Sequence, residues 1–341
     1  MPSPTTALAS AGLPVLLRLD PELAHRLALG ALGLLRHAGK PPPVPPVLAV
    51  TCFGLRFAHP VGVAAGLDKD GDHLDALGAL GFSHVEVGTV TPRPQGGNPR
   101  PRLFRIPRAT ALVNRMGFNS KGVDYAARRL ARTRFEGVRG VSIGKNAATP
   151  LERAVDDYLE CFRKVYGVAD YIAVNVSSPN TAGLRALQTP EHLARIFEPL
   201  RDERSRLAAR HGKRVPVLVK LAPDLAPSEL TSLATELRRL GADGVIATNT
   251  TADLAGVEGV EPVHRGGGLS GRPLHERSVA AIRCLRAASG PDFPIVGVGG
   301  ITDARAALET LAAGANLIQI YTGFVYRGPA LLEEILDALA R

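Results

Sequence analysis

The chain has 341 residues, of which 45% are hydrophobic and 21% charged, so it is a soluble globular protein large enough to bury a substantial core. Its 41 basic and 32 acidic side chains give a net charge of +9, which favours an anionic ligand, an anionic membrane surface or nucleic acid. Nucleic acid is disfavoured because there is no long run of lysine and arginine, and only 5% of residues are aromatic. Three cysteines without CxxC spacing predict free thiols, and nine histidines without ligand spacing predict no metal site.

The first 45 residues differ in composition from the rest of the chain. Leucines crowd residues 13–19 and 23–35, and the break between them at Asp20–Pro21 is typical of a helix start. We therefore expect two short, strongly apolar helices, the second of which ends at Gly39.

The proline-rich segment 41–46 predicts a stiff connector between this extension, residues 1–45, and a main domain of residues 46–341. A leucine-rich helix pair on such a connector is typical of an interfacial membrane element or a hydrophobic docking surface, and a helical cap on the main domain is the alternative. No stretch reaches the ~18 apolar residues of a membrane span, and there is no clear secretory signal. We expect residues 1–40 to lie on an anionic membrane surface.

After the connector, residues 48–51 and 55–58 predict a short hairpin, and strand and helix patterns then alternate. Apolar strands are predicted at 61–64, 84–87, 141–144, 171–176, 215–220, 244–247, 294–298 and 317–320. Helices are predicted near 71–80, 121–134, 150–166, 190–211, 227–240, 275–289, 303–313 and 329–340. Eight strand–helix units are the count of a (β/α)8 TIM barrel. A doubly wound sheet fits less well, because no G-x-G-x-x-G follows the first strand.

Polar residues and glycines gather directly after the predicted strands, where the ligands of a barrel bind. Glycines follow the last two strands, and the segment 266–271 lies just upstream, so backbone N–H groups could hold a phosphate-bearing cofactor. Four asparagines suit a planar ring with alternating C=O and N–H groups, because an amide both donates and accepts. They are Asn114, Asn175, Asn180 and Asn249. Lys69 and Lys220 favour an anionic substrate or negative charge on a cofactor ring.

The fourth strand ends in the sequence Asn175-Val-Ser-Ser-Pro-Asn180. Ser-Pro-Asn is also a common turn sequence, so an ordinary strand exit is one interpretation. No G-x-S-x-G motif surrounds Ser177 and Ser178, so they are not nucleophiles of that hydrolase type. A serine that faces a ring cofactor could move a proton instead, provided that a dry pocket and a relay assist it.

Taken together, the strand-end motifs closely resemble those of the dihydroorotate dehydrogenase family over residues 48–341. They include AAGLDKDG at 64–71, NRMGFNS at 114–120, NVSSPNTAGLR at 175–185, GGLSGRPL at 267–274 and QIYTGF at 319–324. The resemblance implies an FMN-containing barrel that oxidises (S)-dihydroorotate to orotate in pyrimidine biosynthesis. Soluble members of the family use a cysteine as the base, whereas membrane-associated members use a serine and pass electrons to a quinone.

This chain has Ser178 at the position of the base, and its leucine-rich helix pair resembles the quinone-tunnel extension of the membrane-associated class. The resemblance therefore implies a peripheral protein on the cytoplasmic side of the cell membrane, with FMN and a membrane quinone as partners and no obligate protein partner. A related barrel that acts on another pyrimidine, as in dihydropyrimidine dehydrogenase, is disfavoured by the same two features. A membrane-docked barrel that binds a nucleotide without turnover is disfavoured by Ser178, Lys69 and Lys220.

The family pattern also implies the roles of individual residues. Ser178 would take the C5 proton of dihydroorotate while a hydride leaves C6 for the flavin N5. The substrate residues would be Lys69, Asn114, Arg115, Met116, Gly117, Phe118, Asn175, Asn180, Asn249 and Thr250. The FMN residues would be Ala65, Gly66, Leu67, Asp68, Lys69, Thr89, Ser142, Asn175, Lys220, Thr248, Gly271, Gly300, Tyr321 and Thr322. The quinone path would be lined by His25, Arg102 and Tyr321. Ser142 stands where the family usually has asparagine and reaches less far.

Overall fold

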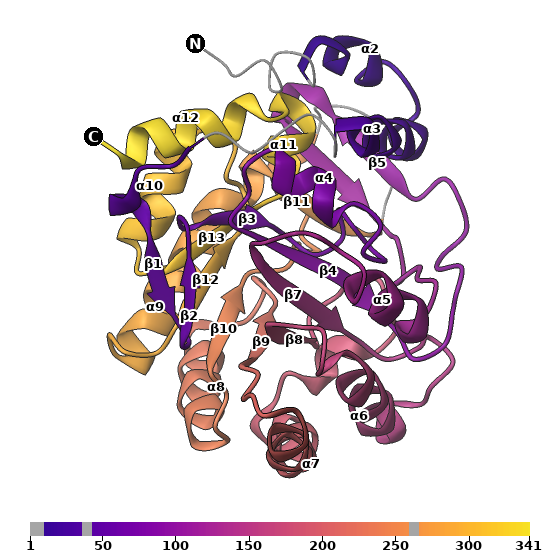
Figure 1. Ribbon diagram of the computed structural model, residues 1–341, viewed down its shortest axis with the longest axis vertical. Coiled ribbons are helices and arrows are strands. Elements are labelled where there is room, and N and C mark those ends of the chain that lie inside the picture. The colour runs from indigo at the N-terminus through magenta and orange to yellow at the C-terminus, as the bar shows by residue number, and fades with distance from the viewer. Residues whose placement is uncertain (1–9, 36–42, 259–265) are drawn as a thin grey trace.

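The computed structural model describes residues 10–35, 43–258 and 266–341. At its centre, eight parallel strands close into a barrel in the order β10-β12-β13-β3-β4-β7-β8-β9 (Figure 1). They are β3 (Val61–Val63), β4 (His84–Val90), β7 (Val138–Ile143), β8 (Tyr171–Asn175), β9 (Val217–Leu221), β10 (Gly244–Ala247), β12 (Ile295–Val298) and β13 (Leu317–Ile320). The predicted barrel is confirmed, and the doubly wound sheet is wrong because β13 pairs with β3 and leaves no open edge.

Helices surround the barrel. They are α4 (Leu74–Ala79), α5 (Val123–Leu130), α6 (Ala154–Val165), α7 (Pro190–His211), α8 (Pro227–Arg239), α9 (His275–Ser289), α10 (Ala304–Ala312), α11 (Thr322–Arg327) and α12 (Ala330–Leu339). The ends follow the sequence signals: the Asp303 side chain accepts a hydrogen bond from the N–H of Ala306 at 2.8 Å at the start of α10, and α7 ends at Gly212. The short α11 was not predicted, because only Tyr321 separates its six residues from β13.

Two layers of apolar side chains form the core, because neighbouring residues of a strand point to opposite faces. In β8, Ile172 and Val174 pack outward against the helices, whereas Tyr171 and Ala173 point into the barrel. The predicted hairpin is formed by β1 (Val50–Cys52) and β2 (Leu55–Phe57). Its Phe53 ring lies 5.6 Å from that of Tyr171, the first residue of β8, so the hairpin closes the amino-terminal end of the barrel.

A second, antiparallel sheet lies at the opposite end of the barrel, in the order β11-β6-β5. Its strands are β5 (Leu103–Ile106), β6 (Ala111–Asn114) and β11 (Gly268–Gly271). The glycine-rich segment 266–271, expected to supply backbone donors, contributes its last four residues to β11, where Gly268 pairs in register with Asn114. A strand as short and as rich in glycine as β11 carries no apolar alternation by which a sequence could reveal it.

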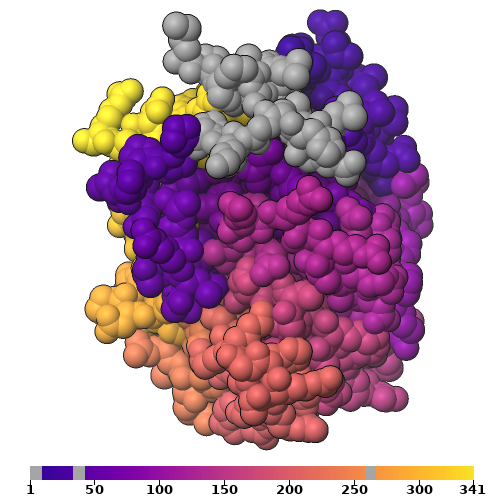
Figure 2. Space-filling model, viewed as in Figure 1, coloured from indigo at the N-terminus to yellow at the C-terminus, as the bar shows by residue number. Residues whose placement is uncertain are grey.

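The N-terminal extension contains α2 (Leu13–Leu16), which is shorter than predicted, and α3 (Pro21–Leu35). The side chain of Asp20 accepts a hydrogen bond from the N–H of Leu23 at 2.9 Å, which caps α3 where the Asp-Pro signal predicted its start. Both helices lie at one end of the molecule (Figures 1 and 2), and α3 contacts β5. The predicted end at Gly39 and the first two prolines of the connector lie outside the described residues. Within the described ranges, no helix is long and apolar enough to cross a bilayer.

Candidate active site

A cavity opens at the carboxyl ends of the barrel strands, and most of the predicted site residues lie in its wall. These are Ala65, Gly66, Lys69, Thr89, Asn114, Met116, Gly117, Phe118, Asn175, Ser178, Asn180, Lys220, Thr248, Asn249, Thr250, Gly271, Gly300, Tyr321 and Thr322. The second sheet completes the wall with Leu103, Leu112 and Ser270, which were not predicted. The barrel and the second sheet thus enclose one site between them.

Four of the residues predicted to hold the substrate or FMN lie outside this wall. Asp68 instead accepts hydrogen bonds from the backbone N–H groups of residues 71, 72 and 73 at 3.0, 3.0 and 2.8 Å, so it shapes the loop after β3. Arg115 donates to the carbonyl of Pro101, and Leu67 lines a different cavity. The Ser142 hydroxyl lies 2.9 Å from that of Thr89 and supports it from behind.

The inward-pointing positions of the strands place polar groups at the barrel mouth. Asn175 of β8 and Lys220 of β9 are direct partners in the strand register, so their side chains lie side by side. One step deeper, the Lys220 Nζ lies 3.9 Å from the Glu86 Oε1, whose other carboxylate oxygen accepts from the Tyr171 hydroxyl at 3.0 Å and from Gln319 at 2.9 Å. Burial lowers the pKa of Lys220, and the Glu86 carboxylate opposes this shift.

The four asparagines converge as predicted, held by their own hydrogen bonds. Asn180 Nδ2 donates to Asn114 Oδ1 at 3.0 Å, and Asn175 Nδ2 donates to the Thr89 hydroxyl at 2.8 Å. Asn249 Nδ2 donates to Ser177 Oγ at 2.9 Å and faces Asn175 Oδ1 at 3.4 Å. Side chains fixed in this way offer their remaining donors and acceptors to a ligand at little entropic cost.

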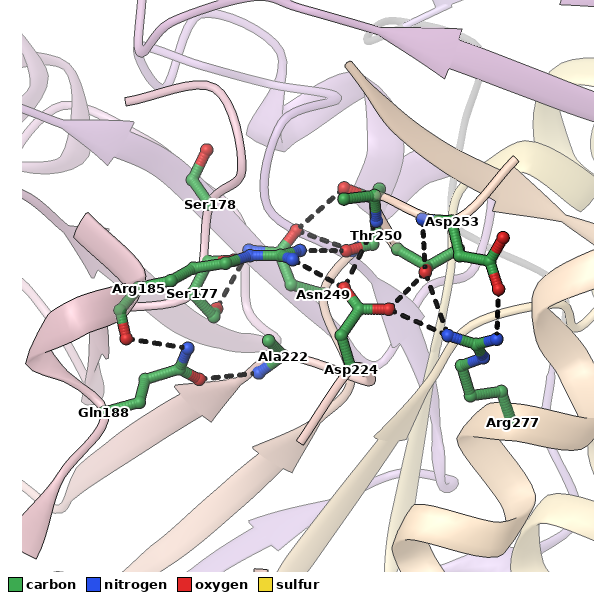
Figure 3. Close-up of polar contacts among 12 residues, drawn as sticks. Ser177, Ser178, Arg185, Gln188, Ala222, Asp224, Asn249, Thr250, Asp253 and Arg277 are labelled. Carbon is green, nitrogen blue, oxygen red and sulfur yellow. Dashed lines mark hydrogen bonds and ion pairs between the residues drawn. The ribbon is translucent and has the colours of Figure 1, made fainter. Parts of the chain in front are cut away.

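The two serines after β8 occupy different environments. Ser177 is fully buried in the asparagine network, whereas Ser178 lines the cavity. In Figure 3 the side chain of Ser178 points away from the polar contacts that surround Ser177. The backbone N–H of Asn180 donates to Ser178 Oγ at 3.2 Å, and such a donor stabilises negative charge that develops on that oxygen.

Lys69 lines the cavity after β3, and desolvation lowers its pKa to about 8, although the nearby Asp70 carboxylate opposes the shift. The glycines at the ends of β12 and β13 leave part of the wall without side chains. A Cβ atom on Gly300 would lie 2.4 Å from the Cα of His275, so only glycine fits there.

A second cavity of about 390 Å³ separates the N-terminal helices from the barrel. Leucine is the most frequent residue in its wall, and it shares Leu103, Leu112 and Tyr321 with the first cavity. Of the predicted quinone residues, His25 and Tyr321 lie in this wall, and burial lowers the pKa of His25 to about 4, which keeps its imidazole neutral. Arg102 lies beside the wall rather than in it, paired with Glu22 at 2.8 Å.

The family model described as dihydroorotate dehydrogenase matches residues 47–341. The chain belongs to the dihydroorotate dehydrogenase family. A relative from Azotobacter vinelandii (strain DJ / ATCC BAA-1303), named dihydroorotate dehydrogenase (quinone), is 55% identical over 335 residues, covering 96% of this chain and 95% of the relative. One of the same name from Pseudomonas putida (strain W619) is 52% identical over 329 residues and covers 96% of each chain.

Solved dihydroorotate dehydrogenase structures agree with these sequence matches. The Eimeria tenella DHODH in complex with ferulenol has a TM-score of 0.87 at 37% identity, with 96% of this chain and 93% of that chain covered. The ligand-free form has a TM-score of 0.84 at 38% identity, with 94% of each covered. The resemblance predicted from the strand-end motifs is therefore confirmed.

Three polar residues of this dihydroorotate dehydrogenase site were not predicted. Glu86 lies beneath Lys220, while Arg185 and Asp224 form an ion pair of 2.5 Å behind the asparagine network. Arg185 is the last residue of the family motif NVSSPNTAGLR at 175–185, but that motif does not indicate what Arg185 contacts.

Proposed function

We propose that this protein oxidises (S)-dihydroorotate to orotate and passes the electrons to a membrane quinone, in the biosynthesis of pyrimidines. One observation carries the proposal. The polar cavity that contains Ser178 shares the wall residue Tyr321 with an apolar cavity under the N-terminal helices. A polar substrate and an apolar acceptor can thus approach one cofactor from two sides. The quinone-dependent activity named for the close relatives supports the same conclusion.

We propose FMN as the cofactor, because the wall of the first cavity fits it. Glycines at the ends of β11, β12 and β13 would let backbone N–H groups approach a phosphate closely, and Lys220 would face the negative charge of the ring. FMN, when bound, would supply the acceptor for the hydride and the donor of electrons to the quinone. The wall residues proposed to hold it are Ala65, Gly66, Lys69, Thr89, Asn175, Lys220, Thr248, Gly271, Gly300, Tyr321 and Thr322.

In the proposed reaction Ser178 is the general base. Its hydroxyl proton leaves to a proton relay as its Oγ accepts the C5 proton, and the N–H of Asn180 stabilises the negative charge on this oxygen as the hydroxyl proton leaves. The Lys69 ammonium pairs with the substrate carboxylate, and the asparagines bind the ring amides. Wall residues 116–118, Thr250 and the second sheet exclude water, which strengthens each of these contacts.

We propose that residues 1–40 hold the enzyme on the cytoplasmic surface of the cell membrane as an extension separate from the barrel domain. Val15, Leu23 and Leu27 expose 64%, 38% and 48% of their surface on these helices, an apolar face that suits the membrane boundary. The quinone would enter between α2 and α3, pass His25 and reach Tyr321. Arg102, held beside the path by Glu22, would orient the quinone head.

Two half-reactions test the proposal in a stopped-flow instrument. Purified protein should be yellow, dihydroorotate should bleach the flavin under anaerobic conditions, and a soluble quinone analogue should restore the colour. Dihydrouracil, which has no carboxylate for Lys69, should bleach it far more slowly. Colourless protein, or added FMN that dihydroorotate does not bleach, would overturn the proposal. Removal of residues 1–40 should abolish quinone reduction and spare electron transfer to a soluble dye.

A further inference from the structure

Arg185 joins the three loops that follow β8, β9 and β10. Its Nε donates to the carbonyl of Ser177 at 3.1 Å, its Nη2 donates to the carbonyl of Thr250 at 2.7 Å, and its Nη1 pairs with the Asp224 carboxylate at 2.5 Å. Because β9 lies between β8 and β10 in the barrel, the guanidinium spans the end of one strand to hold both neighbours (Figure 3). We propose that Arg185, fixed by Asp224, positions the general base Ser178 for the oxidation of the substrate.

The contact with Ser177 explains how a residue outside the cavity can act on the base. The Ser177 carbonyl belongs to the peptide group whose nitrogen is that of Ser178, so a hydrogen bond to this carbonyl fixes the plane from which the Ser178 side chain projects. Ser177 is fully buried, and its carbonyl would otherwise need another partner. Arg185 does not line the cavity, which makes it a positioning residue rather than a catalytic one.

The loops that follow β8 and β10 are joined a second time, on the side that faces the cavity. There Asn249 donates to Ser177 Oγ at 2.9 Å, while Arg185 holds Ser177 and Thr250 from behind. The segment with the base and the segment with two of the proposed substrate residues are therefore held between an inner and an outer set of hydrogen bonds. A planar fork with several donors can reach three acceptors at once, whereas an ammonium cannot match that geometry.

Asp224 holds the guanidinium of Arg185 in place. Its carboxylate also accepts from the Thr251 hydroxyl, from the N–H of Ala252 at 3.2 Å and from Arg277 of α9 at 3.0 Å. Burial alone would raise the pKa of Asp224, but the Thr251 hydrogen bond and the Arg185 charge hold it below its ordinary value. The Arg185 and Asp224 side chains are each 24% exposed, so their pairing is partly shielded from water.

The inference rests on the proposed function, and its test separates the two half-reactions. In FMN-loaded Arg185→Ala protein, bleaching of the flavin by dihydroorotate should slow by about 100-fold, as expected when a reacting group is misplaced by an ångström. Re-oxidation by a quinone analogue should stay within about twofold of the unmodified protein. The bleaching rate of Arg185→Lys should lie between those of Arg185→Ala and the unmodified protein, because lysine keeps the charge and loses the planar guanidinium.

Guanidinium ion distinguishes a positioning role from a general loss of structure. Added at concentrations well below the denaturing range, it should occupy the space left in Arg185→Ala and raise the bleaching rate severalfold. It should not rescue Ser178→Ala, which lacks the base itself. The matched control is Arg153→Ala, which removes an arginine that is 74% exposed and pairs with Asp156 at the surface; its half-reactions should both be unchanged.

Three outcomes would overturn the inference: an unchanged bleaching rate in Arg185→Ala, an equal loss in both half-reactions, or a slow rate that guanidinium does not raise. If Arg185→Ala does not fold, Asp224→Asn and Arg185→Lys carry the same test, and unchanged bleaching in both would overturn it as well. Failure of the proposed function is distinct, because dihydroorotate would then not bleach the unmodified protein at all.

Discussion

Glu22 of α3 and Arg102, one residue before β5, form an ion pair of 2.8 Å whose side chains are only 13% and 6% exposed. Burial alone would raise the pKa of Glu22, but its bonds to Arg102 and Arg100 hold it below the ordinary value. Breaking such a sheltered pair leaves one charge without a partner, at a typical cost of about 3–5 kcal/mol. The N-terminal helices are therefore attached to the catalytic end of the barrel by charge as well as by apolar contact.

Glu22→Ala should slow re-oxidation of the flavin by a quinone analogue by about tenfold, because α3 is no longer tied to Arg102. Bleaching by dihydroorotate should be unaffected. Stopped-flow rates and limited proteolysis of the N-terminal helices measure the two effects. Arg100→Ala is the control: this partner of Glu22 is 60% exposed, so its loss should cost little. A Glu22→Ala protein with normal re-oxidation and protease-resistant helices would contradict this account.

Ser178→Ala should retain FMN and lose about 10²–10⁴-fold in the rate of bleaching by dihydroorotate, the range expected for a missing general base. The flavin absorbance of the purified variant reports cofactor content, and anaerobic stopped flow reports the rate. Ser205→Ala, on the exposed side of α7, should behave as the unmodified protein. If Ser178→Ala kept its full rate, the base would be another residue of the wall.

The affinity for dihydroorotate should fall as the pH rises past 8. Desolvation lowers the pKa of Lys69 to about 8, and the substrate carboxylate binds its ammonium form, so KM should be lowest below that pH. Above it, KM should rise by about tenfold per pH unit, because each unit removes a further nine-tenths of the ammonium form. Lys69→Met should show a raised KM that no longer depends on pH in this window. A flat KM from pH 7 to 9.5 in the unmodified protein would contradict the assignment.

Acid should destabilise the protein well above the range in which carboxylates titrate. Burial lowers the pKa of His84 to about 3, from an unfolded value of about 6.5, and it also lowers the pKa of His59. Between pH 6.5 and 3 the unfolded chain takes up protons that the folded one does not, so its free energy of unfolding falls with falling pH. The expected slope is about 1.4 kcal/mol per pH unit for each such histidine. Urea unfolding at several pH values measures this slope. His84→Gln should reduce it by about 1.4 kcal/mol per pH unit, the contribution of one proton.

The barrel could be predicted because each of its strands is an apolar run followed by a polar or glycine cluster. For β8, the run and its Asn-Val-Ser-Ser end gave both the strand and the candidate base. The second sheet could not be predicted in this way. Its pairing of Gly268 with Asn114 joins segments more than 150 residues apart, and the glycine-rich sequence of β11 does not favour a strand.

In the candidate active site, too, local sequence patterns could be predicted and contacts between distant segments could not. Residues at strand ends, such as Lys69 and Asn175, were predicted because the fold itself brings those ends together. Arg185 was quoted within a motif but given no role, since its three partners meet only when the barrel closes. Arg102 was predicted in the quinone path, yet its contact with Glu22 leaves it beside the wall. Side-chain direction decides such cases, and a sequence does not encode it position by position.

Tyr321, which belongs to both cavities, has a consequence for how the proposed enzyme would work in a membrane. A water-soluble acid and a lipid-soluble oxidant would each have an entrance of its own, and only electrons would cross between them. Orotate could then leave for the cytoplasm before, during or after the binding of quinone. A rise in orotate would slow the enzyme by competing with dihydroorotate, and it would leave the affinity for quinone unchanged.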